Sequence, residues 1–334
     1  MPMPLNLPRT LARAAGITTA SLAGAALAVA GLNRLISQTA PAPEAPMGLT
    51  PERYAWAGGD CVYSVGGKGQ AVVLLHGIYA GASSFEFRHI FPLLLRNFRV
   101  FAPDLPGCGQ SAHPPRVYDP ETYIDFILDF VQQVVGGADA PVHVIASSLT
   151  GAYVIKAAER RPDLFERLIL IEPTGIDHLA VAPSAWQRFL GKLFRAPLVG
   201  TALYHGLVSR PGLRYYLKRQ VYHDPTDVTD DVVDAYYAVG HVPNARYAAS
   251  SFVGGSLNCD IADEFEMLTQ PVLLCWGRHA TFTPLEDAES FMERNVNTEL
   301  AIFDHSASLP QEEEADDFVT QVRNWLRAGI GSRY

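Results

Sequence analysis

Continuous runs of apolar residues recur along the chain and alternate with segments of helical periodicity. A short continuous apolar run is typical of a strand that is buried on both faces of a parallel sheet. Such strands are predicted at residues 71–75, 99–102, 142–145, 168–171, 272–276 and 299–303. Two shorter strands, 54–56 and 61–65, flank Gly58-Gly59 and indicate an opening hairpin.

Helices are predicted between these strands, over residues 123–135, 149–160 and 318–326. A chain that alternates strands and helices in this way forms a mostly parallel sheet with helices on both faces, so the predicted fold class is α/β. The alternation breaks once, because residues 172–270 have no strong strand run. That interval is far too long for a simple loop.

The interval without strands has helical patterns. Its clearest helix has apolar residues at the spacing of a single face: Trp186, Phe189, Leu190, Leu193 and Phe194. Residues 175–258 are therefore interpreted as a helical lid inserted between the core segments 52–174 and 259–334.

The predicted lid also has a run of basic residues that no acidic residue interrupts. The run consists of Arg188, Lys192, Arg195, Arg210, Arg214, Lys218 and Arg219. We favour a solvated face whose charge is balanced by aspartates at positions 224–234. The alternative is a basic, aromatic face that lies near an anionic membrane or admits an amphipathic acyl substrate.

The first 36 residues form a separate segment. Residues 14–32 carry no charge and follow Arg9 and Arg13, and their length just reaches the roughly 20 residues that a bilayer-spanning helix needs. We expect membrane association through residues 14–32 as an uncleaved N-terminal anchor. A signal peptide cleaved near residues 28–30, followed by export, and an amphipathic leader are the alternatives. The proline-rich residues 37–51 are expected to form an extended linker.

The charge balance, the cysteine spacing and the motifs of the chain argue against several classes of protein. The chain of 334 residues has 35 acidic and 26 basic residues and a net charge of −9, which argues against a nucleic-acid-binding protein. Its cysteines form no C-x-x-C pair and are expected to be free thiols: Cys61, Cys108, Cys259 and Cys275. Neither a metal-ligand spacing nor a cofactor motif is present, so no metal and no cofactor is expected.

Ser148 lies between a predicted buried strand and the helix that follows it. This is the context of a G-x-S-x-G nucleophile elbow, a tight turn that needs small residues two positions before and after the serine. Ala146 and Thr150 meet that requirement, whereas a register centred on Ser147 would place larger residues there. Ser148 is therefore the candidate nucleophile, and a serine that only caps the helix is the alternative.

His76, Gly77 and Ile78 follow the first buried run. A glycine at this point lets the loop turn back over the sheet, so the backbone amides of Ile78 and Leu149 are predicted to form an oxyanion hole. His76 and Gly77 are supporting residues of that loop. A D-x-x-G-x-G-x-S loop at residues 104–111 lacks the P-loop pattern, and its glycines are interpreted as structural.

The order of these motifs resembles that of the α/β-hydrolase superfamily. His76-Gly77 comes first, then D-L-P-G-x-G-x-S, the serine elbow, P-V-L-L-x-W-G at 271–277 and a last loop with L-P-x-E-E at 309–313. The resemblance extends over residues 53–328 and is strongest to lidded esterase, epoxide-hydrolase and haloperoxidase-like members. It implies an eight-stranded sheet, a lid after the sixth strand, and hydrolysis of an acyl or related substrate by a serine, a histidine and an acid.

Two positions depart from the family pattern. The family's acid is expected where this chain has Ala280, and its histidine where this chain has Ser308. Neither side chain accepts a serine proton as an imidazole does. In some members, the haloalkane dehalogenases among them, the acid follows the sixth strand. Glu172 is therefore a candidate for a relocated acid, and a structural carboxylate at the strand end is the alternative.

His305 is the first candidate for the base, because it lies three residues before Ser308 on the same predicted loop. His76, His279 and His241 are weaker candidates, since a histidine at a strand end is more often a hydrogen-bonded structural residue.

The sequence supports two main hypotheses. In the first, the protein is a serine hydrolase of esters or related acyl substrates with a non-standard base, either a displaced histidine or a group that acts through water. In the second, it is a non-catalytic α/β-hydrolase-fold protein that binds a small apolar ligand or a partner in the same pocket, as the vacated positions suggest. A cofactor-free lyase or dioxygenase is a weaker third hypothesis, because one fold hosts unrelated functions.

Overall fold

The computed structural model describes residues 9–136 and 140–331. The strands form one sheet in the order β1-β2-β4-β3-β5-β6-β7-β8. β2 pairs antiparallel with β1 and β4, and the remaining neighbours are parallel. The predicted mostly parallel sheet of eight strands is confirmed. The strands are β1 (Glu52–Tyr54), β2 (Cys61–Gly67), β3 (Ala71–Leu75), β4 (Arg99–Pro103), β5 (Val142–Ser147), β6 (Phe165–Ile171), β7 (Val272–Gly277) and β8 (Thr298–Phe303).

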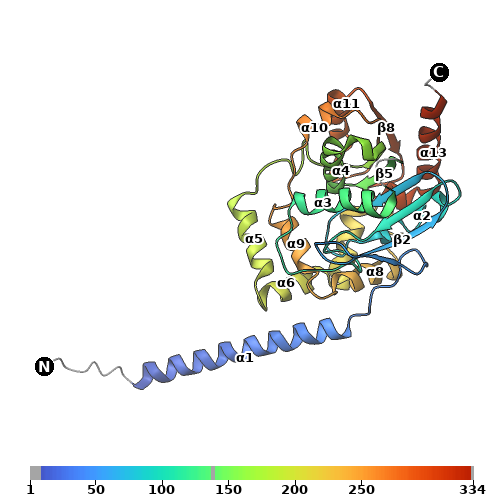
Figure 1. Cartoon of the computed structure of the whole chain (residues 1–334). Coiled ribbons are helices and arrows are strands. Elements are labelled where there is room, and N and C mark those ends of the chain that lie inside the picture. Colours follow the sequence, from blue (N-terminus) through green and yellow to red (C-terminus); the bar gives the residue numbers. More distant parts are fainter. Residues whose placement is uncertain (1–8, 137–139, 332–334) are drawn as a thin grey trace.

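Helices cover both faces of the sheet (Figure 1). Two hydrophobic clusters lie on opposite faces: Val73 and Leu75 belong to one, and Val72 and Leu74 to the other. Because successive side chains of a strand point to opposite faces, an apolar layer on each side requires a continuous apolar run. One face packs against α3 (Pro120–Phe130), α4 (Leu149–Arg160), α10 (Ala262–Met267) and α11 (Asp287–Arg294), and the other against α2 (Ile90–Leu94) and α13 (Ala315–Gly331).

Short helical turns connect several of these elements. They are η1 (Ser84–Phe87), η2 (Val131–Val135), η3 (Pro162–Leu164) and α12 (Pro310–Glu313). The four cysteines are free and buried, as expected.

The chain between β6 and β7 is helical, as predicted. It contains α5 (Ala185–Arg195), α6 (Val199–Leu207), α7 (Arg210–Tyr216), η4 (Leu217–Val221), α8 (Asp230–Gly240) and α9 (Arg246–Val253). That residues 175–258 act as a separate lid stays a prediction. The apolar face expected on α5 is only partly buried, because Trp186 and Phe189 are 64% and 52% exposed and stack on each other.

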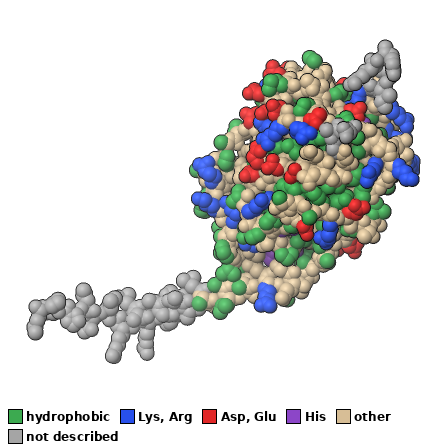
Figure 2. Space-filling view, in the orientation of Figure 1, with side chains coloured by type: hydrophobic (Ala, Val, Ile, Leu, Met, Phe, Trp, Pro, Cys, Tyr) green, Lys and Arg blue, Asp and Glu red, His purple; other side chains and the backbone are tan. Residues whose placement is uncertain are grey.

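Two basic residues of these helices are paired with aspartates of α8. Arg210 forms an ion pair with Asp234 at 2.5 Å, and Arg214 forms one with Asp230. On the face seen in Figure 2, side chains of both charges are interspersed with apolar ones. These contacts agree with the solvated, charge-balanced face that we favour for this segment.

The prediction of a membrane-spanning anchor is wrong. Among the described residues no helix is both long enough and apolar enough to cross a bilayer. The physical reason is that Ala, Gly and Thr fill much of residues 14–32, and burying such small side chains contributes little transfer free energy. The residues belong to α1 (Arg9–Thr39), which projects from the body and meets it near α6 (Figure 1). There Asn33 Nδ2 donates a hydrogen bond to Leu198 O at 3.0 Å.

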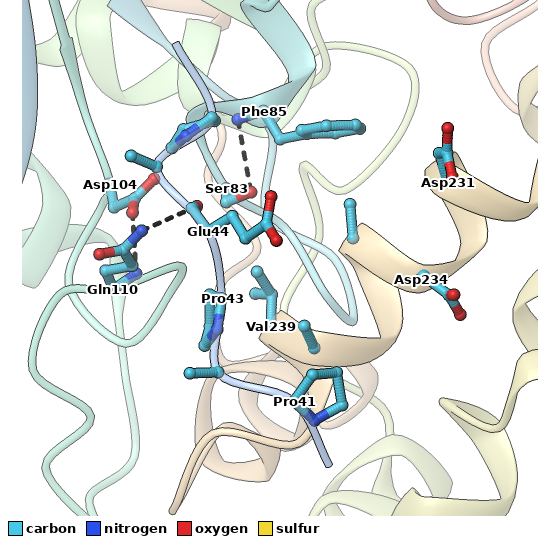
Figure 3. A pocket seen from close by; sticks show the side chains of 15 residues that line it. Pro41, Pro43, Glu44, Ser83, Phe85, Asp104, Gln110, Asp231, Asp234 and Val239 are labelled. Carbon is cyan, nitrogen blue, oxygen red and sulfur yellow. Dashed lines mark hydrogen bonds between the residues drawn. The ribbon is translucent and has the colours of Figure 1, made fainter. Parts of the chain in front are cut away.

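The extended linker begins after α1 and not at residue 37. Residues 41–46 run across the surface as a strap (Figure 3), and Gln110 Nε2 donates to Glu44 O at 2.8 Å. The strap, Phe85 and one side of α8 enclose a cavity of about 600 Å³. Ser148 is not among its lining residues. This cavity is therefore separate from the site that the motifs predict.

Candidate active site

Ser148 has a strained backbone at the turn between β5 and α4. Its φ is 52° and its ψ is −130°, a conformation that residues with a Cβ rarely adopt. Although Ser148 precedes the first residue of α4, its side chain makes no capping hydrogen bond. The hydroxyl is therefore not used to cap the helix, and the strain presents it at the carboxyl edge of the sheet.

A cavity of about 100 Å³ lies at this edge, between the sheet and the inserted helices. The sheet side contributes polar groups, and the inserted helices contribute mostly aromatic and apolar ones. The cavity is lined by Tyr79, Ser147, Ser148, Glu172, Tyr216, Gln220, Val221, Tyr236, Phe282, Thr283, Ser308 and Leu309. The structure thus brings together three of the residues singled out from the sequence, namely Ser148, Glu172 and Ser308.

Glu172 follows β6 and is 3% exposed. Its Oε1 accepts a hydrogen bond from Gly277 N at 3.1 Å, and its Oε2 accepts one from Thr283 Oγ1 at 2.9 Å. Burial raises the pKa of Glu172 to about 8, although these donors and the Ser308 hydroxyl oppose the rise. A carboxyl group with this pKa has the basicity of a histidine, which is the range useful for proton transfer near neutral pH.

Ala280 and Ser308, the two positions at which the sequence predicts a departure from the family pattern, differ in their surroundings. Ala280 is buried and does not line the cavity. Ser308 lies in the loop after β8, where its N–H donates to Val221 O at 3.0 Å, and it lines the cavity beside Glu172. Ser308 therefore places a hydroxyl in the cavity, and its equivalence with the histidine of the family pattern stays a prediction.

No histidine is among the described residues that line this cavity. His305 is exposed after β8, and its backbone N–H donates to Glu314 Oε2 at 2.9 Å. His279 is also exposed and stacks on His223, with ring centroids 3.9 Å apart. His241, at the end of α8, contacts Tyr237 O through Nδ1 at 2.8 Å. The geometry does not bring these candidate bases to Ser148.

His76 is buried and both of its ring nitrogens are occupied. Nε2 accepts a hydrogen bond from Leu105 N at 3.0 Å, and Nδ1 lies 2.7 Å from Gly77 O. An imidazole that accepts at one nitrogen and donates at the other is neutral, and burial lowers the pKa of His76. His76 therefore supports the loop and is not available as a base.

The loop predicted to form the oxyanion hole is tied to the elbow. Thr150 Oγ1 in the first turn of α4 donates to His76 O at 2.7 Å. This bond holds the segment with Gly77 and Ile78 against the start of α4, where the helix dipole favours negative charge. The assignment of the Ile78 and Leu149 amides to an oxyanion hole stays a prediction.

Several residues around the cavity were not singled out from the sequence. Thr283 supports Glu172, Tyr79 and Tyr236 line the cavity, and Glu86 accepts the hydrogen bond of Gly77 N at 3.0 Å. The one signal for Glu86 is a carboxylate between two phenylalanines, Phe85 and Phe87, close after the His-Gly motif. The contacts of Tyr236 and Thr283 depend on the tertiary fold and leave no local signal.

Comparisons with known proteins agree with this architecture. Residues 72–321 match the model of the alpha/beta hydrolase family. The 2-hydroxy-6-oxo-6-phenylhexa-2,4-dienoate hydrolase of Comamonas testosteroni is 25% identical over 276 residues, which cover 79% of this chain and 90% of that protein. The match extends over most of the chain, so the chain belongs to the alpha/beta hydrolase family, and the relative that it resembles is a hydrolase.

Solved structures show the same fold. A serine hydrolase involved in carbazole degradation superposes with a TM-score of 0.67 at 22% identity, covering 84% of this chain and 99% of that one. A membrane phospholipase A described as a bacterial virulence factor superposes with a TM-score of 0.69 at 20% identity, covering 98% of each chain. At these identities the likeness extends to the fold alone.

The strain at Ser148 predicts an unusual order of stability for two variants. Glycine tolerates a positive φ, so Ser148→Gly should be more stable than Ser148→Ala by about 1 kcal/mol in thermal or chemical unfolding. At Ser290, inside α11, the order should reverse, because glycine costs about 0.5–1 kcal/mol relative to alanine in a helix. An alanine variant at least as stable as the glycine variant at Ser148 would contradict the assigned strain.

The raised pKa of Glu172 predicts a pH-dependent stability. The folded chain keeps this proton between an ordinary pKa of 4.5 and about 8, so its ionisation lowers stability as pH rises through that range. Glu172→Gln cannot ionise, and its free energy of unfolding relative to wild type should increase by at least ~1 kcal/mol between pH 5 and pH 9. Denaturant titrations measure this difference, with Glu299→Gln controlling for loss of an exposed carboxylate. A difference that does not change with pH would refute the shift.

Proposed function

We propose that this member of the alpha/beta hydrolase family is a serine hydrolase of esters or related acyl substrates, with Ser148 as nucleophile and Glu172 as base. The observation that carries the proposal is the shared cavity. The uncapped hydroxyl of a strained serine and a buried carboxyl group of raised pKa line the same small space. A serine nucleophile needs an adjacent base, and Glu172 is the basic side chain that the cavity offers.

Ser308 provides the path for the proton. Its hydroxyl lies beside the Glu172 carboxylate and lines the same cavity as Ser148. A hydroxyl accepts one hydrogen bond while it donates another. In the proposed mechanism Ser308 accepts the proton of Ser148 and passes its own to Glu172, so one hydroxyl and one carboxylate replace the imidazole of the family pattern.

The steps conserve atoms and charge. Ser148 Oγ attacks the acyl carbon as its proton moves through Ser308 to ionised Glu172, and the amides of Ile78 and Leu149 hold the oxyanion. When the tetrahedral intermediate collapses, the bond to the leaving alkoxide breaks and the alkoxide takes the proton from Glu172. Water then attacks the acyl-enzyme, gives its proton to Glu172 and releases the acid, and Ser148 recovers its proton.

The substrate class follows from the cavity and the relatives. Aromatic and apolar side chains face Ser148 from the inserted helices and the loop after β7, including Tyr216, Tyr236 and Phe282. A space of about 100 Å³ holds a short acyl group. The relative named above is a hydrolase of a dienoate, which supports a small organic substrate in general and no particular one.

A second candidate function is favoured by one observation. The lining of the cavity includes no histidine among the described residues, and at neutral pH a Glu172 with a pKa of about 8 is mostly protonated. A protein with these properties could instead bind a small apolar ligand at Ser148 without turning it over. Reactivity of the Ser148 hydroxyl separates the two functions.

Labelling with a fluorophosphonate tests the proposal, because the probe reacts with activated serines. We expect peptide mass spectrometry of the labelled full chain to find the adduct on Ser148. Labelling should be lost in Ser148→Ala and kept in Ser147→Ala, which removes the neighbouring hydroxyl of the same cavity. Folded wild-type protein that takes up no label would support the ligand-binding function.

A further inference from the structure

Glu86, in η1, is a buried carboxylate that the proposed reaction does not use. It is 1% exposed. Its Oε2 accepts hydrogen bonds from Gly77 N and Tyr79 OH, each at 3.0 Å, and its Oε1 accepts one from Gln311 Nε2 at 2.9 Å. Burying a carboxylate costs several kcal/mol when no cation is paired with it. In the described part of the chain its hydrogen-bond partners are neutral donors.

These donors come from the two loops that frame Ser148. Gly77 and Tyr79 flank Ile78 in the loop predicted to hold the oxyanion, and Gln311 follows Ser308 and Leu309, which line the cavity. Tyr79 also stacks on Tyr236 of α8, with ring centroids 5.8 Å apart and hydroxyl oxygens 3.4 Å apart. One side chain thus connects the oxyanion loop, the loop of Ser308 and, through Tyr79, an inserted helix.

The chemistry of the contacts explains why this residue is a carboxylate. The hydroxyl of Ser147, beside Ser148, is a further hydrogen-bond partner of Glu86. Four donors thus converge on one side chain, and an ionised carboxylate is a side chain that only accepts. The backbone of Glu86 is itself held, because Ser84 N donates to the buried Asp104 Oδ1 at 2.7 Å. The backbone that carries the Glu86 side chain is therefore anchored, so the carboxylate can orient the neighbouring loops.

We propose that Glu86 is a positioning residue for the reaction at Ser148, which keeps the Gly77–Tyr79 loop oriented so that the Ile78 amide meets the developing oxyanion. The inference rests on the proposed serine hydrolase function. When a hydrogen-bond donor is displaced from the oxyanion, the reaction rate falls by orders of magnitude. A hydrogen bond that holds the loop in place therefore raises kcat.

The surroundings of Glu86 make its role depend on pH. The titratable groups that face it are Tyr79 on the loop, Tyr216 on α7, Tyr236 on α8 and Glu312 on α12, and Arg88 is paired with Glu312 at 2.7 Å. Burial raises the pKa of Glu86 to about 7. Protonation below that pH weakens the carboxyl group as an acceptor and loosens the loop.

The test compares two variants in the hydrolysis of p-nitrophenyl acetate across pH 5.5–9. Glu86→Ala removes every contact and should lower kcat by about 10- to 100-fold, with KM changed by less than about threefold. Glu86→Gln keeps an acceptor for Gly77 and Tyr79, and Gln311 can turn its amide oxygen, which has no partner, toward the new amide. This variant should stay within about threefold of wild type at pH 8 and lose the steeper fall in rate that wild type shows below pH 7.

The controls separate failure of this inference from failure of the proposed function. Glu299→Gln, the same change on β8, should behave like wild type at every pH. If Glu86→Ala does not fold, the pH profile of Glu86→Gln decides. A Glu86→Gln profile that keeps the steeper fall of wild type below pH 7, beyond the fall that Glu172 causes, would overturn the positioning role alone. A folded Glu86→Ala with wild-type kcat would do the same. Wild type that neither hydrolyses the ester nor reacts with fluorophosphonate would overturn the proposed function and this inference with it.

Discussion

The hydrogen bonds that Glu172 accepts hold together the segments at the carboxyl edge of the sheet that surround Ser148. The carboxylate follows β6 and binds Gly277 at the end of β7 and Thr283 in the next loop, and the Ser308 hydroxyl of the loop after β8 lies beside it. Three segments that are distant in sequence therefore meet at one buried carboxyl group. The same burial that makes this group costly also raises its pKa to about 8, which gives a carboxylate the basicity of an imidazole.

The nucleophile Ser148 is positioned by its strained backbone and by a hydrogen bond that holds the neighbouring loop. The positive φ of Ser148 brings its hydroxyl to the sheet edge, and the bond from Thr150 to His76 O holds the first turn of α4 against the loop after β3. Glu86 is a second buried carboxylate, and it holds the same loop by accepting hydrogen bonds from Gly77 N and Tyr79 OH. Carboxyl groups and hydroxyls on fixed loops thus surround Ser148, and none of the described residues that line its cavity is a histidine.

The elements of the sheet could be predicted from the sequence because each buried strand needs apolar residues on both faces, as in residues 71–75 and 272–276. The elbow at Ser148 could be found for a similar reason, since a tight turn admits only small neighbours. The expected membrane anchor failed on physical grounds, because residues 14–32 have the length of a membrane span without its hydrophobicity. The helix expected around Trp186 is present as α5, although Trp186 and Phe189 of its apolar face are exposed. The partners of Glu86 and Glu172 come from segments far along the chain, which periodicity and local motifs do not detect.

The pH dependence of fluorophosphonate inactivation shows whether Glu172 takes the proton of Ser148. For wild type, we expect a second-order rate constant that rises with pH and levels off above about 8, as the carboxyl group ionises. In Glu172→Gln the rate should be low and independent of pH, and His305→Ala should leave the wild-type profile unchanged. A wild-type rate that levels off near the ordinary histidine pKa of about 6.5 and is lost in His305→Ala would rule out Glu172 as the base and return that role to a displaced histidine.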